Sequence, residues 1–435
     1  MESTADDTQV TVRFVTKLPP DLRVPEDALA VPTNIKRLGL SKIINHLLAL
    51  EPAKPFDFAV GGRLLRGTLQ ELLAAEQISV ESILEVEYLP IVVPPKTKES
   101  AVHDEWISVV DASISNEILS GSYDGAIRAW SGTLECKWSL PAHETPITGL
   151  ARVTLPDRQM IITSGQENTV RAWKLPKKPG KNASIVALLK GHKEVVQSVC
   201  ANPSGTKCCT ASWDATARIW PCGGDLLNSG ISGGENGAAA DENGATKKRK
   251  VENGGGIVSG ESSAIEVESS SVLEGHTGAV SAVKWEEEET IITGGWDHTV
   301  RRWDVETGAN IDTHNGRKVV HSISPCQGSS LIAFVGADPA LRIWDPRDQS
   351  DAISLKTFKS HSGWVVGVEW SRHSEFHVAT CSYDETVKMW DVRGAIPLGT
   401  IDSHEDKVLC VDWVGKEGLV SGGADCNLKL HMSDN

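Results

Sequence analysis

The sequence has no run of 18 apolar residues, which excludes a transmembrane helix. Its first ten residues, MESTADDTQV, are acidic and lack the apolar stretch of a secretory signal. Basic side chains are outnumbered as well: 43 Lys and Arg stand against 58 Asp and Glu, which gives a formal net charge of −15. A general nucleic-acid coat needs the opposite balance, so we expect another class of protein.

Tryptophan and cysteine are missing from the first hundred residues, although the chain holds 14 Trp and nine Cys. The composition therefore changes near residue 95, where the stretch PIVVPPKTKES (residues 90–100) is typical of a linker. This change predicts two differently built domains. An odd number of cysteines without a secretory signal indicates reduced thiols in the cytosol or nucleus.

Seven segments of the second part repeat one pattern, a small residue followed by an acidic turn residue and a basic–x–aromatic ending. They are SYDGAIRAW (122–130), GQENTVRAW (165–173), SWDATARIW (212–220), GWDHTVRRW (295–303), GADPALRIW (336–344), SYDETVKMW (382–390) and the degenerate GADCNLKLH (423–431). A histidine precedes each acidic residue by 21 to 24 positions. The two landmarks recur together seven times, which excludes chance.

Short β-branched and apolar runs such as AVSAVKW, TIITGG and TVRRW predict four antiparallel strands per repeat. The pattern resembles the WD-repeat β-propeller, whose GH and WD dipeptides stand at Gly275-His276 and Trp303-Asp304. Without an insert at 221–271 each copy has about 41 residues, so we predict seven blades over residues 105–435. The last copy ends after its third strand. We therefore expect residues 93–104 to be a linker and the strand that closes the ring.

The repeated His–Asp pairs admit a catalytic or a structural interpretation. Catalysis needs one unique constellation, whereas equivalent copies favour architecture. The resemblance implies that His, Asp, a Ser or Thr and the Trp of one blade hydrogen-bond one another and satisfy buried polar groups. We assign this network to His103, Asp124, Trp130, His192, Asp214, Trp220, His276, Asp297, Trp303, His361, Asp384 and Trp390. Departures at Gln166-Glu167 and in the last copy predict weaker networks there.

Two other repeated features are each compatible with packing or with binding. A basic residue stands two positions before each closing aromatic, from Arg128 to Lys429, and its even repetition favours packing along the strand over RNA binding. An aromatic residue precedes the acidic turn residue in four copies: Tyr123, Trp213, Trp296 and Tyr383. Packing between blades is the favoured interpretation, and an exposed interaction hot spot is the alternative.

The insert at residues 221–271 is rich in Gly and Ser and has no aromatic residue. It cannot bury enough surface to offset chain entropy, which predicts a disordered loop between the third and fourth blades. Within it Lys247, Lys248, Arg249 and Lys250 form a compact basic cluster. We interpret this cluster as a nuclear localisation signal, with a solvated charge run as the alternative.

The first domain, residues 8–92, predicts a small α+β fold. Residues 9–18 and 27–34 read as two strands, and 41–50 as a helix that Ser41 caps. The stretch from FDFAV to ILEVEYL resembles the second half of ubiquitin, so we expect a ubiquitin-like (β-grasp) domain. The chain runs on without a terminal diglycine, which favours a docking module over a conjugated modifier.

A ubiquitin-like domain before a WD propeller resembles a family of ribosome-assembly proteins. The pieces VRFVTKL, RLGLSKIINHLL and LEVEY are similar to the members that partner pescadillo and the block-of-proliferation protein. The resemblance implies a scaffold in large-subunit rRNA maturation (25S/28S and 5.8S) in the nucleolus and nucleoplasm. Its propeller would dock on the propeller of the block-of-proliferation protein, on pre-60S particles.

The same resemblance implies that the AAA ATPase midasin removes the complex by gripping the ubiquitin-like domain. In that family a Glu before the last strand completes the coordination of an adhesion-site Mg²⁺, and the matching residue here is Glu81. Mg²⁺ takes octahedral oxygen ligands and keeps exchangeable positions, so a partner's carboxylate can fill one. A solvated surface Glu is the alternative.

Two other functions stay open. A Notchless-type assembly factor shares the domain order but has eight blades, and a WD-repeat receptor of a ubiquitin ligase would need a cullin-adaptor element that we do not find. No P-loop or H-E-x-x-H motif is present, and Cys208-Cys209 lacks metal-site spacing. We therefore expect a protein that is not an enzyme and has no cofactor or metal of its own.

Overall fold

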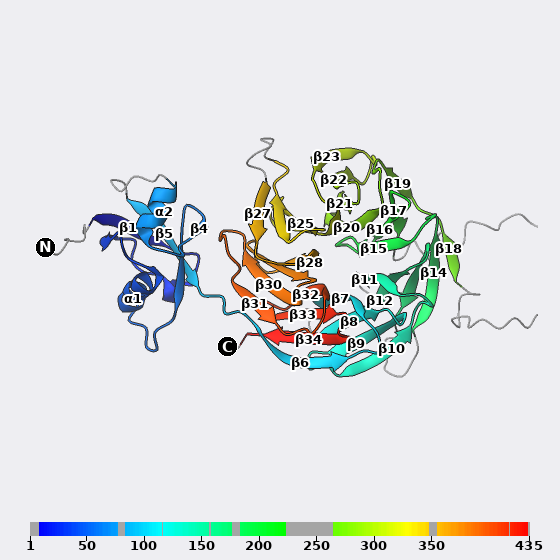
Figure 1. Cartoon of the computed structure of the whole chain (residues 1–435), viewed down its shortest axis with the longest axis horizontal. Helices are drawn as coiled ribbons and strands as arrows, with labels where there is room; N and C mark the ends of the chain where they lie inside the picture. The colour runs from blue at the N-terminus through cyan, green and yellow to red at the C-terminus, as the bar shows by residue number, and fades with distance from the viewer. Residues whose placement is uncertain are drawn as a thin grey trace, which may run out of the picture. The chain divides into compact units, whose positions relative to one another are not determined.

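The computed structural model describes residues 8–76, 83–114, 116–155, 158–175, 183–222, 264–347, 355–416 and 418–433. The chain divides into two compact units (Figure 1). One is Met1–Val93 with Asp391–Leu398, and the other is Pro94–Trp390 with Gly399–Asn435. We describe each unit separately. No helix among the described residues combines the length and the hydrophobicity needed to cross a membrane.

The first unit is a five-stranded sheet with two α-helices. Its elements are β1 (Gln9–Val15), the 3-10 helix η1 (Pro20–Leu22), β2 (Ala28–Pro32), α1 (Arg37–Leu47), β3 (Phe56–Val60), β4 (Arg63–Leu64), α2 (Leu69–Glu76) and β5 (Leu84–Pro90). The strand order is β2-β1-β5-β3-β4, with β1 and β5 parallel and the other neighbours antiparallel. This arrangement confirms the predicted ubiquitin-like fold.

The core of this unit follows from the alternation in QVTVRFV. Val10, Val12 and Phe14 point to one face of the sheet and are buried, while the residues between them are more exposed. Leu40 and Ile44, one turn apart on α1, pack against that face.

The predicted start of the first helix was wrong. The helix begins at Arg37, so Ser41 lies inside it and does not cap it. Ser41 is buried, and its Oγ accepts a hydrogen bond from the backbone N–H of Phe56 at 3.1 Å. A polar residue that looks like a helix cap therefore connects the helix to β3.

The second unit contains seven sheets, which confirms the predicted seven-bladed propeller. The first three blades are β7 (Ile107–Ile114), β8 (Glu117–Ser122), β9 (Ala126–Ser131) and β10 (Cys136–Pro141); β11 (Ile147–Leu155), β12 (Arg158–Gly165), β13 (Thr169–Lys174) and β14 (Ser184–Lys190); and β15 (Val196–Ala201), β16 (Lys207–Ser212), β17 (Thr216–Pro221) and β19 (Ser271–Glu274). The fourth and fifth are β20 (Val280–Glu287), β21 (Thr290–Gly295), β22 (Thr299–Asp304) and β23 (Asn310–Asn315); and β24 (Val320–Pro325), β25 (Ile332–Gly336), β26 (Ala340–Trp344) and β27 (Leu355–Lys359).

The sixth blade is β28 (Val365–Trp370), β29 (His377–Ser382), β30 (Thr386–Asp391) and β31 (Gly399–Asp402). The seventh combines β32 (Val408–Val414), β33 (Gly418–Gly423) and β34 (Asn427–Met432) with β6 (Lys96–Val102) from the other end of the chain. β6 pairs antiparallel with β34, with Ala101 opposite Leu428 (Figure 1). The ring is therefore closed by backbone pairing between its two ends.

The predicted insert of 221–271 was placed wrongly between the third and fourth blades, because its flanking strands β17 and β19 are neighbours within the third blade. Pro221 ends β17, and residues 264–271 include β18 (Ile265–Val267), which pairs parallel with β14 as a fifth strand of the second blade. Val267 is buried there, because its alternation with Glu266 matches the open edge of β14. The basic cluster at Lys247, Lys248, Arg249 and Lys250 lies outside the described residues.

Candidate functional site

The predicted polar network is complete in the third blade. His192 Nδ1 lies 2.8 Å from Asp214 Oδ2, and its Nε2 lies 2.7 Å from Thr210 Oγ1. Trp220 Nε1 donates to the same hydroxyl at 2.8 Å. The fourth blade repeats this geometry with His276, Asp297, Thr293 and Trp303, and the sixth with His361, Asp384, Thr380 and Trp390.

The electrostatics of the networks in the fourth and sixth blades favour a neutral histidine beside an ionised carboxylate. Burial lowers the pKa of His276 and of His361. Burial alone would raise the pKa of Asp214, but hydrogen bonds from His192, Thr216 and the Lys193 backbone outweigh it, so that the pKa is lowered. Equivalent pairs recur in several blades, so they act as buried supports of the blades and offer no unique reactive group.

The network predicted for the first blade is wrong at one link. His103 Nε2 and Trp130 Nε1 each lie 2.8 Å from Ser120 Oγ, as expected. His103 Nδ1, however, has no hydrogen-bond partner among the described residues, because Asp124 instead accepts from Arg128 Nη2 at 2.6 Å. Burial, with the positive charge of Arg128, lowers the pKa of His103 to about 4.

The two networks expected to be weak have all their side-chain links. In the second blade Glu167 replaces Asp and still bonds His143, whose Nε2 lies 2.8 Å from Thr163 Oγ1. In the last blade His431 replaces Trp, and its Nε2 lies 2.8 Å from Ser421 Oγ. The fifth blade is the one that loses its hydroxyl, because Phe334 stands at the Ser/Thr position and packs on His314.

The repeated basic residues lie against the acidic turn residue of their own blade in at least four cases. These pairs are Arg128–Asp124, Arg171–Glu167, Arg342–Asp338 and Lys429–Asp425. Such an arrangement neutralises each charge locally, which agrees with the packing interpretation and gives RNA no continuous cationic ring.

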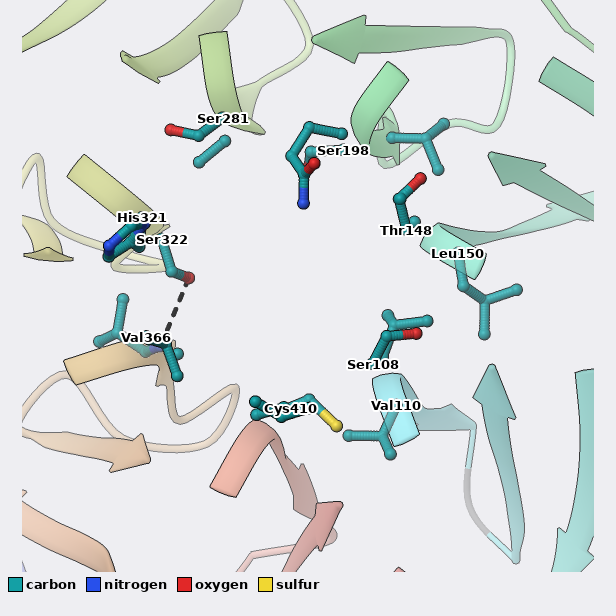
Figure 2. Close-up of a pocket in the computed structure, with 18 of the residues that line it drawn as sticks. Ser108, Val110, Thr148, Leu150, Ser198, Ser281, His321, Ser322, Val366 and Cys410 are labelled. Carbon is teal, nitrogen blue, oxygen red and sulfur yellow. Dashed lines mark hydrogen bonds between the residues drawn. The ribbon is translucent and has the colours of Figure 1, made fainter. Parts of the chain in front are cut away.

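A central cavity of about 450 Å³ lies between the innermost strands of the blades (Figure 2). Hydroxyl side chains on its wall connect neighbouring blades. Ser108 Oγ donates to the carbonyl of Ile147, and Thr148 Oγ1 to that of Val196, both at 2.6 Å. Ser281 Oγ donates in the same way to Val320.

Charged side chains in the cavity are paired across blades. Lys284 Nζ lies 2.9 Å from Glu369 Oε2, and Arg372 Nη2 lies 2.8 Å from Asp412 Oδ1. Asp412 also accepts a hydrogen bond from the Ala112 backbone at 2.7 Å. The carboxylates of these pairs are engaged, which makes them poor candidates for a general base. The described residues include no cluster of three or more His, Cys, Asp or Glu arranged to hold a metal.

The aromatic residues at one end of the blades are exposed. Trp213, Trp296 and Tyr383 are 46, 49 and 38% exposed. This exposure favours an interaction hot spot, the alternative to packing between blades. Trp106 and Trp364, which the sequence analysis missed, are 41 and 51% exposed at the same end. Both stand three residues after a blade histidine, and this shared spacing was the available signal.

Glu81 falls between α2 and β5, outside the described residues. Its predicted role therefore rests on the sequence resemblance alone.

Comparison with known proteins supplies the family. The model for the NLE (NUC135) domain matches residues 10–73, and the WD domain, G-beta repeat, matches 134–174, 183–221, 267–304, 353–391 and 395–431. Proteins named ribosome biogenesis protein WDR12 homolog are similar over nearly the whole chain. The identity is 43% in Chlamydomonas reinhardtii (99% of each chain), 39% in Arabidopsis thaliana (96% of this chain, 95% of the relative) and 35% in Nematostella vectensis (98 and 100%).

The chain belongs to the WDR12 family of ribosome biogenesis proteins. This result confirms the predicted family and the order of the two domains. The repeat matches leave out the main strands of the first and fifth blades. These are the blades in which Asp124 turns away from His103 and in which Phe334 replaces a hydroxyl residue. In this WDR12-type propeller, the two blades whose main strands the repeat model does not match are therefore also the two whose internal hydrogen bonding is altered.

Proposed function

We propose that this chain is a non-enzymatic scaffold in maturation of the large ribosomal subunit, including 25S/28S and 5.8S rRNA. The observation that carries the proposal is the similarity to ribosome biogenesis proteins across both domains. The repeated His–acid pairs support a non-enzymatic role, because their side chains hydrogen-bond within the blades and stabilise them.

The partners in this proposal are pescadillo and the propeller of the block-of-proliferation protein, with which the chain would assemble on pre-60S particles. The proposed sites of action are the nucleolus and nucleoplasm. The basic cluster Lys247, Lys248, Arg249 and Lys250 would serve nuclear import. The pairing of the repeated basic residues with acids of their own blades supports a protein-binding propeller and argues against extensive direct rRNA contact.

Release would use the first domain. Glu81 would supply one carboxylate oxygen to the Mg²⁺ of midasin's adhesion site, and ATP-driven force on the domain would then detach the complex. Coordination of the Mg²⁺ needs an anionic oxygen on a side chain of the right length. Asp is shorter by one methylene and Gln lacks the charge, so neither should replace Glu81 fully.

The test is tagged purification of the full chain from cells, with Glu81→Ala, Glu81→Gln and Glu81→Asp beside the wild type. Glu85→Ala is the matched control, since Glu85 is an exposed carboxylate on β5. We expect pescadillo and the block-of-proliferation protein with every variant, and accumulation on pre-60S particles with the Glu81 variants alone. Recovery of cullin subunits, or absence of both partners, would overturn the scaffold. Normal release of the Glu81→Ala chain would overturn the release step.

A further inference from the structure

Six aromatic side chains gather at one end of the blades, and we call them the aromatic rim: Trp106, Tyr123, Trp213, Trp296, Trp364 and Tyr383. Backbone hydrogen bonds fix them at the same end. The N–H of Tyr123 donates to the Trp106 carbonyl at 2.8 Å, and that of Tyr383 to the Trp364 carbonyl at 2.9 Å. Every strongly exposed aromatic side chain among the described residues belongs to this rim. Such concentration on one face is typical of a protein-binding surface.

The rim borders the central cavity. Tyr123, Trp213, Trp296 and Tyr383 contribute to its lining, so the rings surround its mouth. Trp213 and Trp296, from adjacent blades, have ring centroids 6.1 Å apart, and Trp364 stacks on Tyr383 at the same distance. The mutual packing limits the motion of the rings, so less entropy is lost when a partner orders them.

The cavity wall favours a guest that donates hydrogen bonds. Ser108 and Ser281 give their hydroxyl protons to backbone carbonyls, so their oxygens remain as acceptors, whereas the Thr148 oxygen already lies 3.0 Å from Ser164 Oγ. Figure 2 shows Ser108, Thr148 and Ser281 around the open centre. The deeper carboxylates that line the cavity are each paired: Glu369 with Lys284, Asp412 with Arg372, and Asp111 with Arg152 at 3.4 Å.

Charge on one side of the rim, at the first and seventh blades, points the same way. Asp104, Glu105, Glu405 and Asp406 occupy the two turns that precede β7 and β32, and we call them the acidic sector. Asp104 and Glu105 directly precede Trp106 in the chain, and Glu405 and Asp406 lie in the seventh blade, whose β32 contacts β7 of the first blade. One cation of this face, Lys407, already lies over the Tyr383 ring with Nζ 5.3 Å from its centroid. The rim can therefore hold a cation on an aromatic face.

We propose that the aromatic rim docks a loop or tail of a partner protein whose arginine side chain enters the mouth of the cavity. A guanidinium suits the site because it stacks on aromatic rings, pairs with carboxylates and donates up to five hydrogen bonds. RNA fits less well, because the acidic sector repels phosphates. The assignment rests on the propeller alone and is independent of Glu81 and of the release step.

The test uses the full chain labelled with fluorotryptophan and followed by fluorine NMR, with resonances assigned by Trp→Phe variants. The probe is a short Gly/Ser peptide with two arginines, compared with lysine and glutamate versions and with an oligouridylate. We expect saturable shifts at the rim tryptophans with the arginine peptide, weaker binding of the lysine peptide and none of the glutamate peptide.

Two variants and one control locate the site. Trp106→Ala and Glu105→Lys should each weaken binding of the arginine peptide by about tenfold. Ile311→Ala, which alters a side chain 49% exposed on β23, should leave it unchanged. Thermal melting verifies that each variant folds. Tighter binding of the oligouridylate, equal binding of the glutamate peptide, or no saturable shift up to about 10 mM arginine peptide would overturn the proposal. Particle association in cells is a separate readout, so failure of the proposed scaffold would not be confused with failure of this site.

Discussion

Thr97 Oγ1 and His431 Nδ1 lie 2.9 Å apart, although 334 residues separate them in the chain. Thr97 is on β6, the strand from the N-terminal side, and His431 is on β34, near the C-terminus. His431 stands where six blades have a tryptophan, and its other nitrogen meets Ser421. The substitution in the last blade thus couples the blade's polar network to the strand that closes the ring.

Ring closure should therefore control propeller stability. Deletion of Lys96–Val102 removes the outer strand of the last blade, and we expect it to unfold or open the ring. Thr97→Val keeps the strand but leaves His431 Nδ1 unpaired, which should cost about 1–3 kcal/mol in the free energy of unfolding. Urea unfolding followed by tryptophan fluorescence measures both. Thr133→Val, at an exposed turn, is the control. An unchanged unfolding midpoint in the deletion variant would contradict the closure.

The internal networks predict a second stability effect. Thr210→Val removes the hydroxyl that Trp220 and His192 share in the third blade, leaving two buried groups without a partner. We expect a loss of about 2–4 kcal/mol. Phe334→Thr offers the comparison, because it introduces a hydroxyl where the fifth blade packs an aromatic ring. That change should destabilise through lost packing. Equal stability of Thr210→Val and wild type would show that the network is dispensable.

Local spacing in the sequence was sufficient to predict the blades and most of their networks. The His–acid interval specifies which residues meet in the third, fourth and sixth blades, because the first three strands of each of these blades are consecutive in the chain. It could not predict that Asp124 turns to Arg128, since that choice depends on side-chain geometry in three dimensions. Nor could it place β18 beside β14, because a short parallel pairing across two blades leaves no local pattern. Comparison of the repeats could have predicted the lost hydroxyl of the fifth blade, because Phe334 stands where the other copies have Ser or Thr.

The Nδ1 of His103 in the first blade, unpaired within the described part of the chain, predicts that the stability of the propeller depends on pH. The pKa of His103 is lowered to about 4, mainly by burial, from an ordinary value of about 6.5. Below pH 6.5 the unfolded chain takes up a proton on His103, whereas the folded chain does so only near pH 4. The free energy of unfolding therefore falls as the pH drops from 6.5 to 4, and it levels off below pH 4. His103→Gln keeps a polar group but does not titrate. Between pH 7 and pH 4, the free energy of unfolding should fall by less in this variant than in the wild type. The difference between the two decreases should be on the order of 3 kcal/mol. Parallel pH profiles would exclude His103 as the cause.

Thiol reactivity should separate the cysteines by burial. Seven are buried, Cys426 is partly exposed, and Cys136 is the exposed one. Burial raises the pKa of Cys200 to about 12 and also raises the pKa values of Cys208 and Cys209, so little thiolate forms at neutral pH. Burial, then the nearby carboxylates led by Glu105, raises the pKa of Cys426 as well. A thiol reagent should therefore modify Cys136 first and Cys426 more slowly, and the other seven only after unfolding. Mass spectrometry of the native and urea-treated chain measures this order, and Cys136→Ser should abolish the fast phase. Fast labelling of Cys208 or Cys209 in the native protein would mean that the third blade opens readily, because neither sulfur is otherwise accessible.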